Sequence, residues 1–255
     1  MNIQGKIAVI SGGASGMGAA TVQHLIEAGA KVAVLDSNKT LLNDIAKHAH
    51  VLPISCDVTD ENSVVDAFKI IKETWGIVRI CVSCAGIVSA KRIVSTDQSP
   101  MPLDDFARVI NINLIGTFNL LRVAASYMAT LEKNEDEEEG GVIINTASIA
   151  AYEGQIGQAA YAASKGGIVS LTLPAARELA RYGIRVMTIA PGLIETPMLH
   201  SLPENVKEAL VANIPFPQRL GKASEFALLV QHIIENPLLN GSVIRLDGAL
   251  RMSSA

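Results

Sequence analysis

The chain has 255 residues, of which 49% are hydrophobic and 18% are charged. This composition supplies enough apolar material for a continuous core and excludes an intrinsically disordered chain. The formal net charge of −4 gives no excess positive field for a nucleic-acid backbone or an anionic membrane, so neither is an expected partner. At about 150 residues per domain, the length permits one large domain or two small ones.

Aromatic residues make up only 4% of the chain, so the core must be built mainly from aliphatic side chains. Such richness is typical of parallel strands that are covered on both faces. The three cysteines, Cys56, Cys81 and Cys84, are too few for a secreted disulfide framework and favour a reducing compartment. Residues 1–6 run straight into a strand-like segment without a signal or transit peptide, and no apolar stretch approaches the about 20 residues of a membrane span. We therefore expect a cytoplasmic protein.

Strand and helix patterns alternate along the chain. Short apolar runs predict strands over residues 6–11, 31–36, 51–55, 78–83, 141–146, 184–189 and 242–246. Helical spacing predicts helices over residues 19–28, 38–48, 61–75, 103–131 and 159–182. Right-handed crossovers between parallel strands make this an α/β fold, a doubly wound Rossmann-like sheet of about seven strands with helices on both faces. Because no linker interrupts the alternation, residues 1–255 are predicted to form one domain.

Two segments break the alternation. Residues 89–102 read as a polar loop after the fourth strand. Residues 193–220 hold four prolines around one short helix that starts with a capping box, Ser201 to Glu204, and this segment is predicted to be a substrate lid. A separate acidic run, residues 135–139, is interpreted as a solvated turn between a helix and a strand.

A glycine-rich segment, Ser-Gly-Gly-Ala-Ser-Gly-Met-Gly, lies where the first predicted strand leads into the first predicted helix. Gly12 permits a tight turn, Gly16 lets a pyrophosphate approach the main chain, and Gly18 lets the helix pack closely on the sheet. The helix N-terminus offers N–H groups to phosphates, and Ser15 and Met17 would add hydroxyl or backbone contacts. A glycine-rich turn alone could be an ordinary loop, but its place between a strand and a helix favours dinucleotide binding.

Asp36 ends the second predicted strand, where a carboxylate can accept hydrogen bonds from both ribose hydroxyls and repel a 2′-phosphate. This favours NAD over NADP; the alternative is that Asp36 caps the helix that begins near Asn38. Asp57 and Val58 follow the third strand at the same edge and could contact the adenine. Cys84, at the end of the fourth strand, lies at that edge too.

The segment Cys81-Val-Ser-Cys84 has the spacing of a redox or zinc motif. Alternation along a strand, however, sends residues three apart to opposite faces. A zinc site would also need further ligands, and Cys56 is the only other thiol in the sequence. No metal site is therefore predicted.

The catalytic signal consists of Ser148, Tyr161 and Lys165. A spacing of four puts Tyr161 and Lys165 on one face of a predicted helix. A cation about 4 Å from a phenol stabilises the phenolate by up to about 4 kcal/mol, which predicts a lowered pKa for Tyr161. Ser148, just beyond the strand over residues 141–146, can donate a hydrogen bond to a substrate oxygen as charge develops on it. A Tyr-x-x-x-Lys spacing alone is more often a surface pair, and the presence of the other parts in order reverses that interpretation.

Together these parts resemble the short-chain dehydrogenase/reductase family over the whole chain. The matching motifs are the glycine-rich segment, Asp57-Val58, Ala85-Gly86, Asn113 in Asn-Ile-Asn-Leu, Ser148, Tyr161 with Lys165, and Pro191-Gly192 with Thr196. One departure is Ser83-Cys84-Ala-Gly, where the family usually has Asn-Asn-Ala-Gly. The departure concerns hydrogen bonding that stabilises the central sheet rather than the chemistry.

The resemblance implies a role for each matched residue. Tyr161 would be the general acid and base, while Lys165 would hold the nicotinamide ribose and lower the tyrosine pKa. Ser148 would orient the substrate and Asn113 would hold a water of the proton relay. Ile194 and Thr196 would contact the nicotinamide amide.

Longer strings resemble the 3-hydroxyacyl-CoA dehydrogenases of that family, some of which are also described as hydroxysteroid dehydrogenases. They cover residues 141–148, 152–155, 157–161, 189–193, 235–241 and 243–249, and the insertion at 89–102 is similarly placed. The resemblance implies reversible oxidation of the 3-hydroxyl of an acyl-CoA by NAD, in fatty acid metabolism, by a homotetramer. The alternatives are a hydroxysteroid or other secondary-alcohol dehydrogenase, a 3-oxoacyl carrier-protein reductase, against which Asp36 counts, and a non-catalytic binding subunit.

Overall fold

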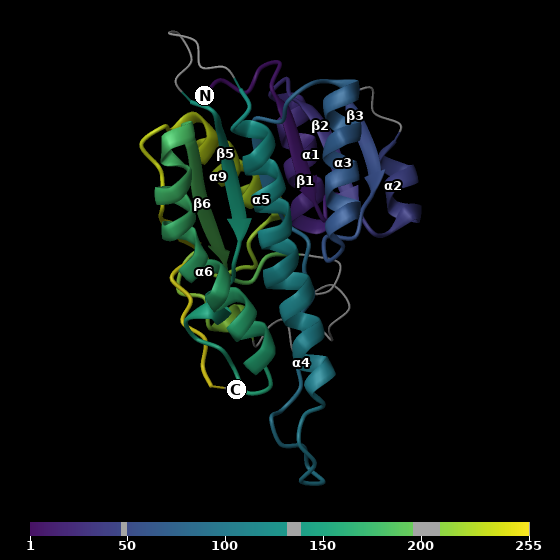
Figure 1. Ribbon diagram of the computed structural model, residues 1–255. Helices are drawn as coiled ribbons and strands as arrows, with labels where there is room; N and C mark the ends of the chain where they lie inside the picture. The colour runs from purple at the N-terminus through teal and green to yellow at the C-terminus, as the bar shows by residue number, and fades with distance from the viewer. Residues whose placement is uncertain (47–49, 132–138, 196–209, 255) are drawn as a thin grey trace.

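A parallel sheet of seven strands forms the centre of the protein (Figure 1), which confirms the predicted fold class. The structure is a computed structural model that describes residues 1–46, 50–131, 139–195 and 210–254. The strands are β1 (Ile7–Ser11), β2 (Lys31–Asp36), β3 (Val51–Ser55), β4 (Ile80–Ser83), β5 (Gly141–Thr146), β6 (Ile184–Pro191) and β7 (Val243–Leu246). Their order in the sheet is β3-β2-β1-β4-β5-β6-β7, and every neighbouring pair is parallel.

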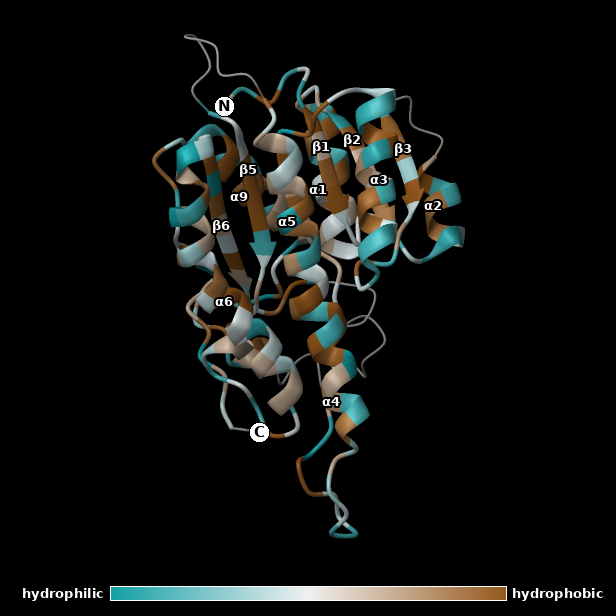
Figure 2. Cartoon of the chain, in the orientation of Figure 1, coloured by the Kyte–Doolittle hydropathy of each residue, from teal (hydrophilic) through white to brown (hydrophobic). Residues whose placement is uncertain are grey.

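Helices cover both faces of the sheet. On one face lie α1 (Gly16–Glu27) and α9 (Ala223–Glu235); on the other lie α3 (Glu61–Thr74), α5 (Gly116–Met128) and α6 (Ala159–Leu179). Two further helices are shorter: α2 (Lys39–Ile45) and α4 (Leu103–Ile110). Because the central strands are covered on both sides, they are apolar along almost their whole length (Figure 2), as the aliphatic composition predicts.

The strand order reverses between β1 and β4. The chain proceeds outward from β1 to β2 and β3, and then from β4 to the other edge. Loops that leave the carboxyl ends of β1 and β4 therefore diverge, which opens a crevice in doubly wound sheets. Gly12 packs against Ala85 and Cys84 at this point, so the glycine-rich turn lies in the crevice.

Two helical features differ from the predictions. Helix α9 was not predicted, although Phe226, Val230 and Ile233 follow a helical period and are fully buried. The predicted helix over residues 103–131 contains a π-helical turn, η1 (Asn111–Ile115), between α4 and α5. Such turns are frequent at functional sites because they shift the side chains that follow.

The helical run Leu103–Met128 corrects the expectation that no stretch could span a membrane. By length and composition alone this run of 26 residues, with a mean hydropathy of 1.3 in its most apolar 18-residue window, is long and apolar enough to do so. However, 56% of this window is buried inside the protein, as in a helix of a protein core.

The predicted lid helix at Ser201 to Glu204 and residues 135–138 of the acidic run lie outside the described residues. Glu139 is described, and it does not fit a solvated turn. Its carboxylate is 2.7 Å from the buried Arg185 guanidinium and 3.0 Å from the amino group of Met1. The end of the acidic run is therefore part of the folded structure, because Arg185 needs a counter-charge where it is buried.

The structure separates the cysteines of the CxxC segment, as predicted. Cys81 lies in the core under α3 and α5, whereas Cys84 packs against the core under α1 and α9. In the described part of the chain, no three His, Cys, Asp or Glu side chains are arranged to hold a metal ion.

Candidate active site

The glycine-rich turn joins β1 to α1 and leaves no room for a side chain at Gly12 or Gly18. Gly12 and Gly16 have positive φ angles of 62° and 53°, which favour glycine. A Cβ on Gly18 would lie 2.1 Å from the Gly12 carbonyl oxygen, so only glycine lets α1 approach the strand this closely. Ser15 is the N-cap of α1, and its hydroxyl makes no capping hydrogen bond within the described structure. A tight glycine turn, with this hydroxyl and Met17 in the first turn of the helix, fits a phosphate group.

Asp36 lies beside this turn at the end of β2. Its carboxylate accepts hydrogen bonds from the Ala14 amide at 3.2 Å and the Asn38 amide at 2.9 Å. Asn38, rather than Asp36, caps α2 through its side chain. Asp36 therefore ties the end of β2 to the glycine turn, and the remaining lone pairs of its carboxylate can accept further hydrogen bonds at the sheet edge.

Asp57 and Val58 follow β3 at the same edge. The Asp57 carboxylate accepts from both the amide and the hydroxyl of Thr59, which forms a local turn. The Val58 side chain packs against Gly116 of α5, and its carbonyl accepts from Asn119. These contacts fix the backbone of the β3 end beside the crevice.

The structure brings Ser148, Tyr161 and Lys165 together. Ser148 follows β5 and Tyr161 lies in the first turn of α6, and the two side chains share a hydrogen bond. The Ser148 hydroxyl also accepts from the Ala150 amide at 3.1 Å, so its own proton is directed to the Tyr161 oxygen, which is why this bond lowers the tyrosine pKa. The buried Lys165 ammonium lies 5.8 Å from the centre of the Tyr161 ring and donates to the Thr146 carbonyl at 2.8 Å.

The pKa of Tyr161 moves in the direction opposite to the prediction. Burial raises it, and the hydrogen bond with Ser148 only partly offsets this rise. Burial also lowers the pKa of Lys165 to about 8, against a smaller raising effect of Cys84. The predicted lowering by Lys165 is therefore wrong for this geometry, because desolvation outweighs the attraction of an ammonium held on the Thr146 carbonyl.

Asn113 is fully buried in the π-helical turn. Its amide nitrogen donates to the Ile87 carbonyl at 2.9 Å and to the Ser164 hydroxyl at 3.0 Å, and its amide oxygen accepts from the Ile87 amide at 2.8 Å. The side chain is thus occupied in fixing the loop after β4 and the start of α6. The Asn113 main-chain carbonyl accepts from the Thr117 hydroxyl and keeps a second lone pair that could hold a water.

The Ser83-Cys84 departure has the expected effect on the central sheet. The Ser83 hydroxyl reaches only the amide oxygen of Asn145 on β5, at 3.4 Å, and the Asn145 amide nitrogen is buried without a partner in the described structure. Cys84 accepts from the Thr146 hydroxyl, and burial raises the pKa of its thiol to about 11. Cys84 therefore carries no charge near neutral pH and forms a neutral wall next to Lys165.

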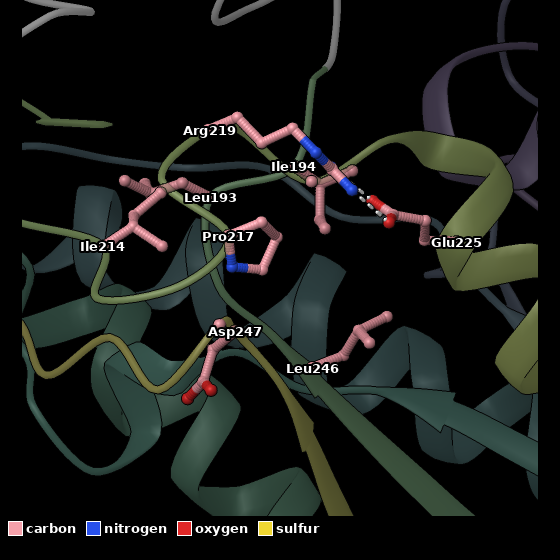
Figure 3. A pocket seen from close by; sticks show the side chains of 10 residues that line it. Leu193, Ile194, Ile214, Pro217, Arg219, Glu225, Leu246 and Asp247 are labelled. Carbon is pink, nitrogen blue, oxygen red and sulfur yellow. Dashed lines mark hydrogen bonds and ion pairs between the residues drawn. The ribbon is translucent and has the colours of Figure 1, made fainter. Parts of the chain in front are cut away.

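Ile194, which follows β6, is buried and pairs with Gly221 in an isolated parallel bridge. Thr196 lies outside the described residues. Ile194 lines a small cavity of about 100 Å³, together with Leu193, Ile214 and Pro217, and the Arg219–Glu225 ion pair lies at its side (Figure 3). The cavity is lined by residues from both ends of the predicted lid, residues 193–220, and is not lined by Ser148 or Tyr161.

The sequence patterns did not indicate an ion pair that the fold places near this site. Arg245 of β7 forms a bidentate ion pair with Glu153, which follows Ser148 in the chain. The two residues are 92 positions apart in sequence, so no local spacing could indicate the pair.

Known proteins resemble this chain over nearly its whole length. A family model for short chain dehydrogenases matches residues 6–207. The chain is 51% identical to the 3-hydroxyacyl-CoA dehydrogenase type-2 of Bos taurus, over 98% of this chain and 97% of that protein. It is 50% identical to the protein of the same name from Drosophila melanogaster, over 98% and 99%. The crystal structure of 3-hydroxyacyl-CoA dehydrogenase type-2 from Mycobacterium avium superimposes with a TM-score of 0.93 at 41% identity, covering 98% of each chain.

These similarities agree with the site geometry. The site combines a phosphate-binding turn with a Ser, Tyr and Lys constellation. Proteins of the matched family generally use NAD or NADP. The chain therefore belongs to the short-chain dehydrogenase/reductase family and is an oxidoreductase that acts on CH–OH groups.

Proposed function

We propose that this protein is an NAD-dependent 3-hydroxyacyl-CoA dehydrogenase of fatty acid metabolism, which interconverts the 3-hydroxy and 3-oxo forms of an acyl-CoA. The observation that carries the proposal is the Ser148, Tyr161 and Lys165 constellation together with a glycine turn whose Ala14 amide is bonded to Asp36. The relatives named 3-hydroxyacyl-CoA dehydrogenase type-2 support the substrate, since they match at about half of all positions.

Asp36 supports NAD rather than NADP, because its negative charge would repel a 2′-phosphate. The residues proposed to hold the cofactor are Gly12, Ser15, Gly16, Met17, Gly18, Asp36, Asp57, Val58, Cys84, Tyr161, Lys165, Ile194 and Thr196. When bound, NAD supplies the hydride acceptor for oxidation and NADH the hydride for reduction.

Tyr161 and Ser148 act on the substrate oxygen. In reduction, the neutral Tyr161 phenol donates its proton to the oxygen of the 3-oxo group as negative charge develops there. Ser148 donates a second hydrogen bond to the same oxygen, which replaces the Tyr161 oxygen as the acceptor of its proton. A raised tyrosine pKa suits this direction, because the phenol is then fully protonated near neutral pH. In oxidation the roles reverse, and the Tyr161 phenolate accepts the hydroxyl proton.

Lys165 and Asn113 support the proton transfer. With one ammonium proton on the Thr146 carbonyl, Lys165 retains two donors for a ribose and for the proton path. We place the relay water at the Asn113 main-chain carbonyl, since both N–H groups of the side-chain amide are already bonded, to Ile87 and Ser164, and its oxygen holds the Ile87 amide.

The insertion at residues 89–102 supports a large substrate with an apolar part. It forms a small hairpin that extends beyond α4 (Figure 1), with Ile93 68% and Val94 56% exposed. The amide of Lys91 donates to the Gly157 carbonyl, which joins the hairpin base to the loop before Tyr161. An acyl-CoA is large and partly apolar enough to contact both the site and this hairpin.

A substrate panel tests the proposal. Purified protein and NADH would be incubated with acetoacetyl-CoA, a 3-oxoacyl carrier protein and a ketosteroid, and NADH consumption would be measured. We expect the highest kcat/KM with the CoA ester. Preference for the carrier protein or the steroid would instead support a carrier-protein reductase or a hydroxysteroid dehydrogenase. No turnover of any secondary alcohol or ketone would support a binding subunit.

We also propose a homotetramer located in the cytoplasm. Large apolar side chains are exposed on several helices, among them Phe118 at 46%, Leu173 at 44% and Leu228 at 59%, and such exposure favours interfaces between copies. The three unpaired thiols support a reducing compartment. Light scattering of the purified protein and imaging of a tagged chain would test these two proposals.

A further inference from the structure

Arg245 of β7 is the centre of a cluster that joins three segments. Its guanidinium donates to both oxygens of Glu153, at 2.7 and 2.9 Å, and to Asp247 at 2.6 Å. It also donates to the Leu250 carbonyl at 2.9 Å and lies 5.2 Å from the centre of the Tyr152 ring. Only an arginine can make this set of contacts, because its planar fork presents several donors in fixed directions.

Glu153 lies on the same short turn as Ser148. The Glu153 amide donates to the Ile149 carbonyl at 3.0 Å, and the Ala151 amide donates to the Ser148 carbonyl at 3.0 Å. At Gly154 this turn packs so closely on α6 that a Cβ would lie 2.9 Å from the Ala162 side chain, next to Tyr161. A shift of Glu153 would therefore move Ser148 relative to Tyr161.

The C-terminal residues hold the other side of the cluster. Leu250 is buried against Ile149 and Ile214, and the Ser254 carbonyl accepts from the Ile156 amide at 2.9 Å. The backbone and Cβ of Asp247 press against Gly192 at the end of β6. Its carboxylate points away from the apolar side chains of the neighbouring cavity (Figure 3) and toward its partners Arg245 and Arg251.

We propose that Arg245 is a positioning residue: through Glu153 and Asp247 it holds the turn that carries Ser148 in register with Tyr161 and with the ends of β6 and β7. Arg245 donates to a carboxylate one turn away from Ser148, so it acts through the turn and not on the substrate. This inference rests on the proposed reaction at Ser148 and Tyr161.

A role in positioning predicts a specific change in the pH profile. The Ser148 hydrogen bond lowers the pKa of Tyr161, so its loss raises that pKa further. The other groups that face this pair are Lys165, on the same helix, and the neutral Cys84 beside it. Neither contacts Arg245, so a changed Tyr161 titration in an Arg245 variant would report on Ser148.

Arg245→Lys is the test variant, because it keeps the charge and removes the fork. We expect kcat to fall about tenfold with KM nearly unchanged, since small displacements of reacting groups can lower a rate by up to about a hundredfold. We also expect the acidic limb of the pH profile of alcohol oxidation to move to higher pH, because the Ser148 hydrogen bond that lowers the Tyr161 pKa is weakened. Glu153→Gln should cause a similar loss, and the double variant should lose little more than either single one, because the two act as one unit.

Arg185→Lys is the matched control. Arg185 also pairs with a glutamate and with main-chain carbonyls, but at the opposite end of β6. Its lysine variant should lower the melting temperature while leaving kcat and the pH profile unchanged. An equal kinetic change in Arg185→Lys, or an unchanged kcat and pH profile in Arg245→Lys, would overturn the proposal.

Hydrogen exchange separates this inference from the substrate assignment. Amides of residues 149–156 should exchange faster in Arg245→Lys than in the wild type or Arg185→Lys, without any substrate present. Kinetics would use whichever substrate of the panel the wild type turns over fastest. Failure of acetoacetyl-CoA would then contradict the proposed function alone, whereas unchanged exchange at residues 149–156 would contradict the role of Arg245.

Discussion

The two ends of the sheet treat their buried polar groups differently. At the amino end, Arg185 donates to Glu139 at 2.8 Å and to three carbonyls, those of Ile233, Ile234 and Leu239, at the end of α9 and just beyond it. At the carboxyl end, the buried Lys165 ammonium has one acceptor in the described structure, and the Ser15 hydroxyl does not cap its helix. Arg185 at the amino end is thus fully bonded within the protein, whereas Lys165 and Ser15 at the carboxyl end keep donors for a ligand.

This difference indicates which end of a doubly wound sheet binds the ligand. A fully bonded buried charge stabilises the fold, since breaking its contacts leaves an uncompensated charge. A buried donor with spare capacity is costly unless a ligand completes it. Substitutions at the carboxyl end should therefore change binding and rate, and those at the amino end should change stability.

Tyr161→Phe should give the largest effect. Removing the hydroxyl removes the proton donor and acceptor, so kcat should fall by about 10²–10⁴-fold, the usual contribution of general acid–base catalysis. The melting temperature should stay close to that of the wild type, because the ring still fills its place. Steady-state kinetics and calorimetry would check this. A variant that retains a tenth of the activity would contradict the role of Tyr161 as the general acid and base.

Arg185→Met should have the opposite signature at the amino end. It leaves three carbonyls without their donor and Glu139 with only the Met1 amino group, so the free energy of unfolding should fall by about 3 kcal/mol. Denaturant titration measures the loss, and kinetics at a temperature where the variant is folded should match the wild type. A large drop in kcat with unchanged stability would show that the two ends do not divide in this way.

Gly18→Ala should affect both binding and stability. The new methyl would meet the Gly12 carbonyl oxygen, so the turn must shift, at a cost of about 1–3 kcal/mol, and NADH affinity should fall. Gly166→Ala is the matched control, since a Cβ there meets nothing within 4 Å and alanine favours a helix. Equal NADH affinity in both variants would argue against cofactor binding at this turn.

Asp36→Asn should change cofactor choice. Loss of the negative charge should reduce the preference for NADH over NADPH by about tenfold, in line with about 1.5 kcal/mol for a hydrogen bond to a charged group. Asp44→Asn, on the exposed side of α2, removes the same charge away from the turn and should leave the preference unchanged. The ratio of kcat/KM values for the two cofactors is the measurement.

The pH dependence of oxidation should differ from that of reduction. The pKa of Tyr161 is raised, so the phenolate needed for oxidation is scarce at neutral pH and increases as pH rises. Oxidation of the alcohol should therefore speed up throughout the range from neutral to about pH 10, the usual tyrosine pKa, while reduction should stay constant over most of it. Initial rates in both directions would decide, and an oxidation rate that is flat above pH 7 would indicate a lowered pKa instead.

Most of the fold could be predicted because each strand is marked by a local apolar run, and several of the family motifs fall at strand ends. The π-helical turn around Asn113 could not, since it depends on backbone hydrogen bonding rather than residue type. The Arg245–Glu153 and Arg185–Glu139 pairs join residues distant in sequence. The pKa of Tyr161 was predicted in the wrong direction because spacing places Lys165 on the right face but does not reveal the burial that outweighs it.

Hydrogen exchange of the wild type with and without NADH tests the contrast between the two ends most directly. We expect slower exchange of the amides in the turn from Gly12 to Gly18 and in the first turns of α6, with no change around Arg79 and Arg185. Protection at the amino end, or none at the glycine turn at saturating NADH, would contradict it.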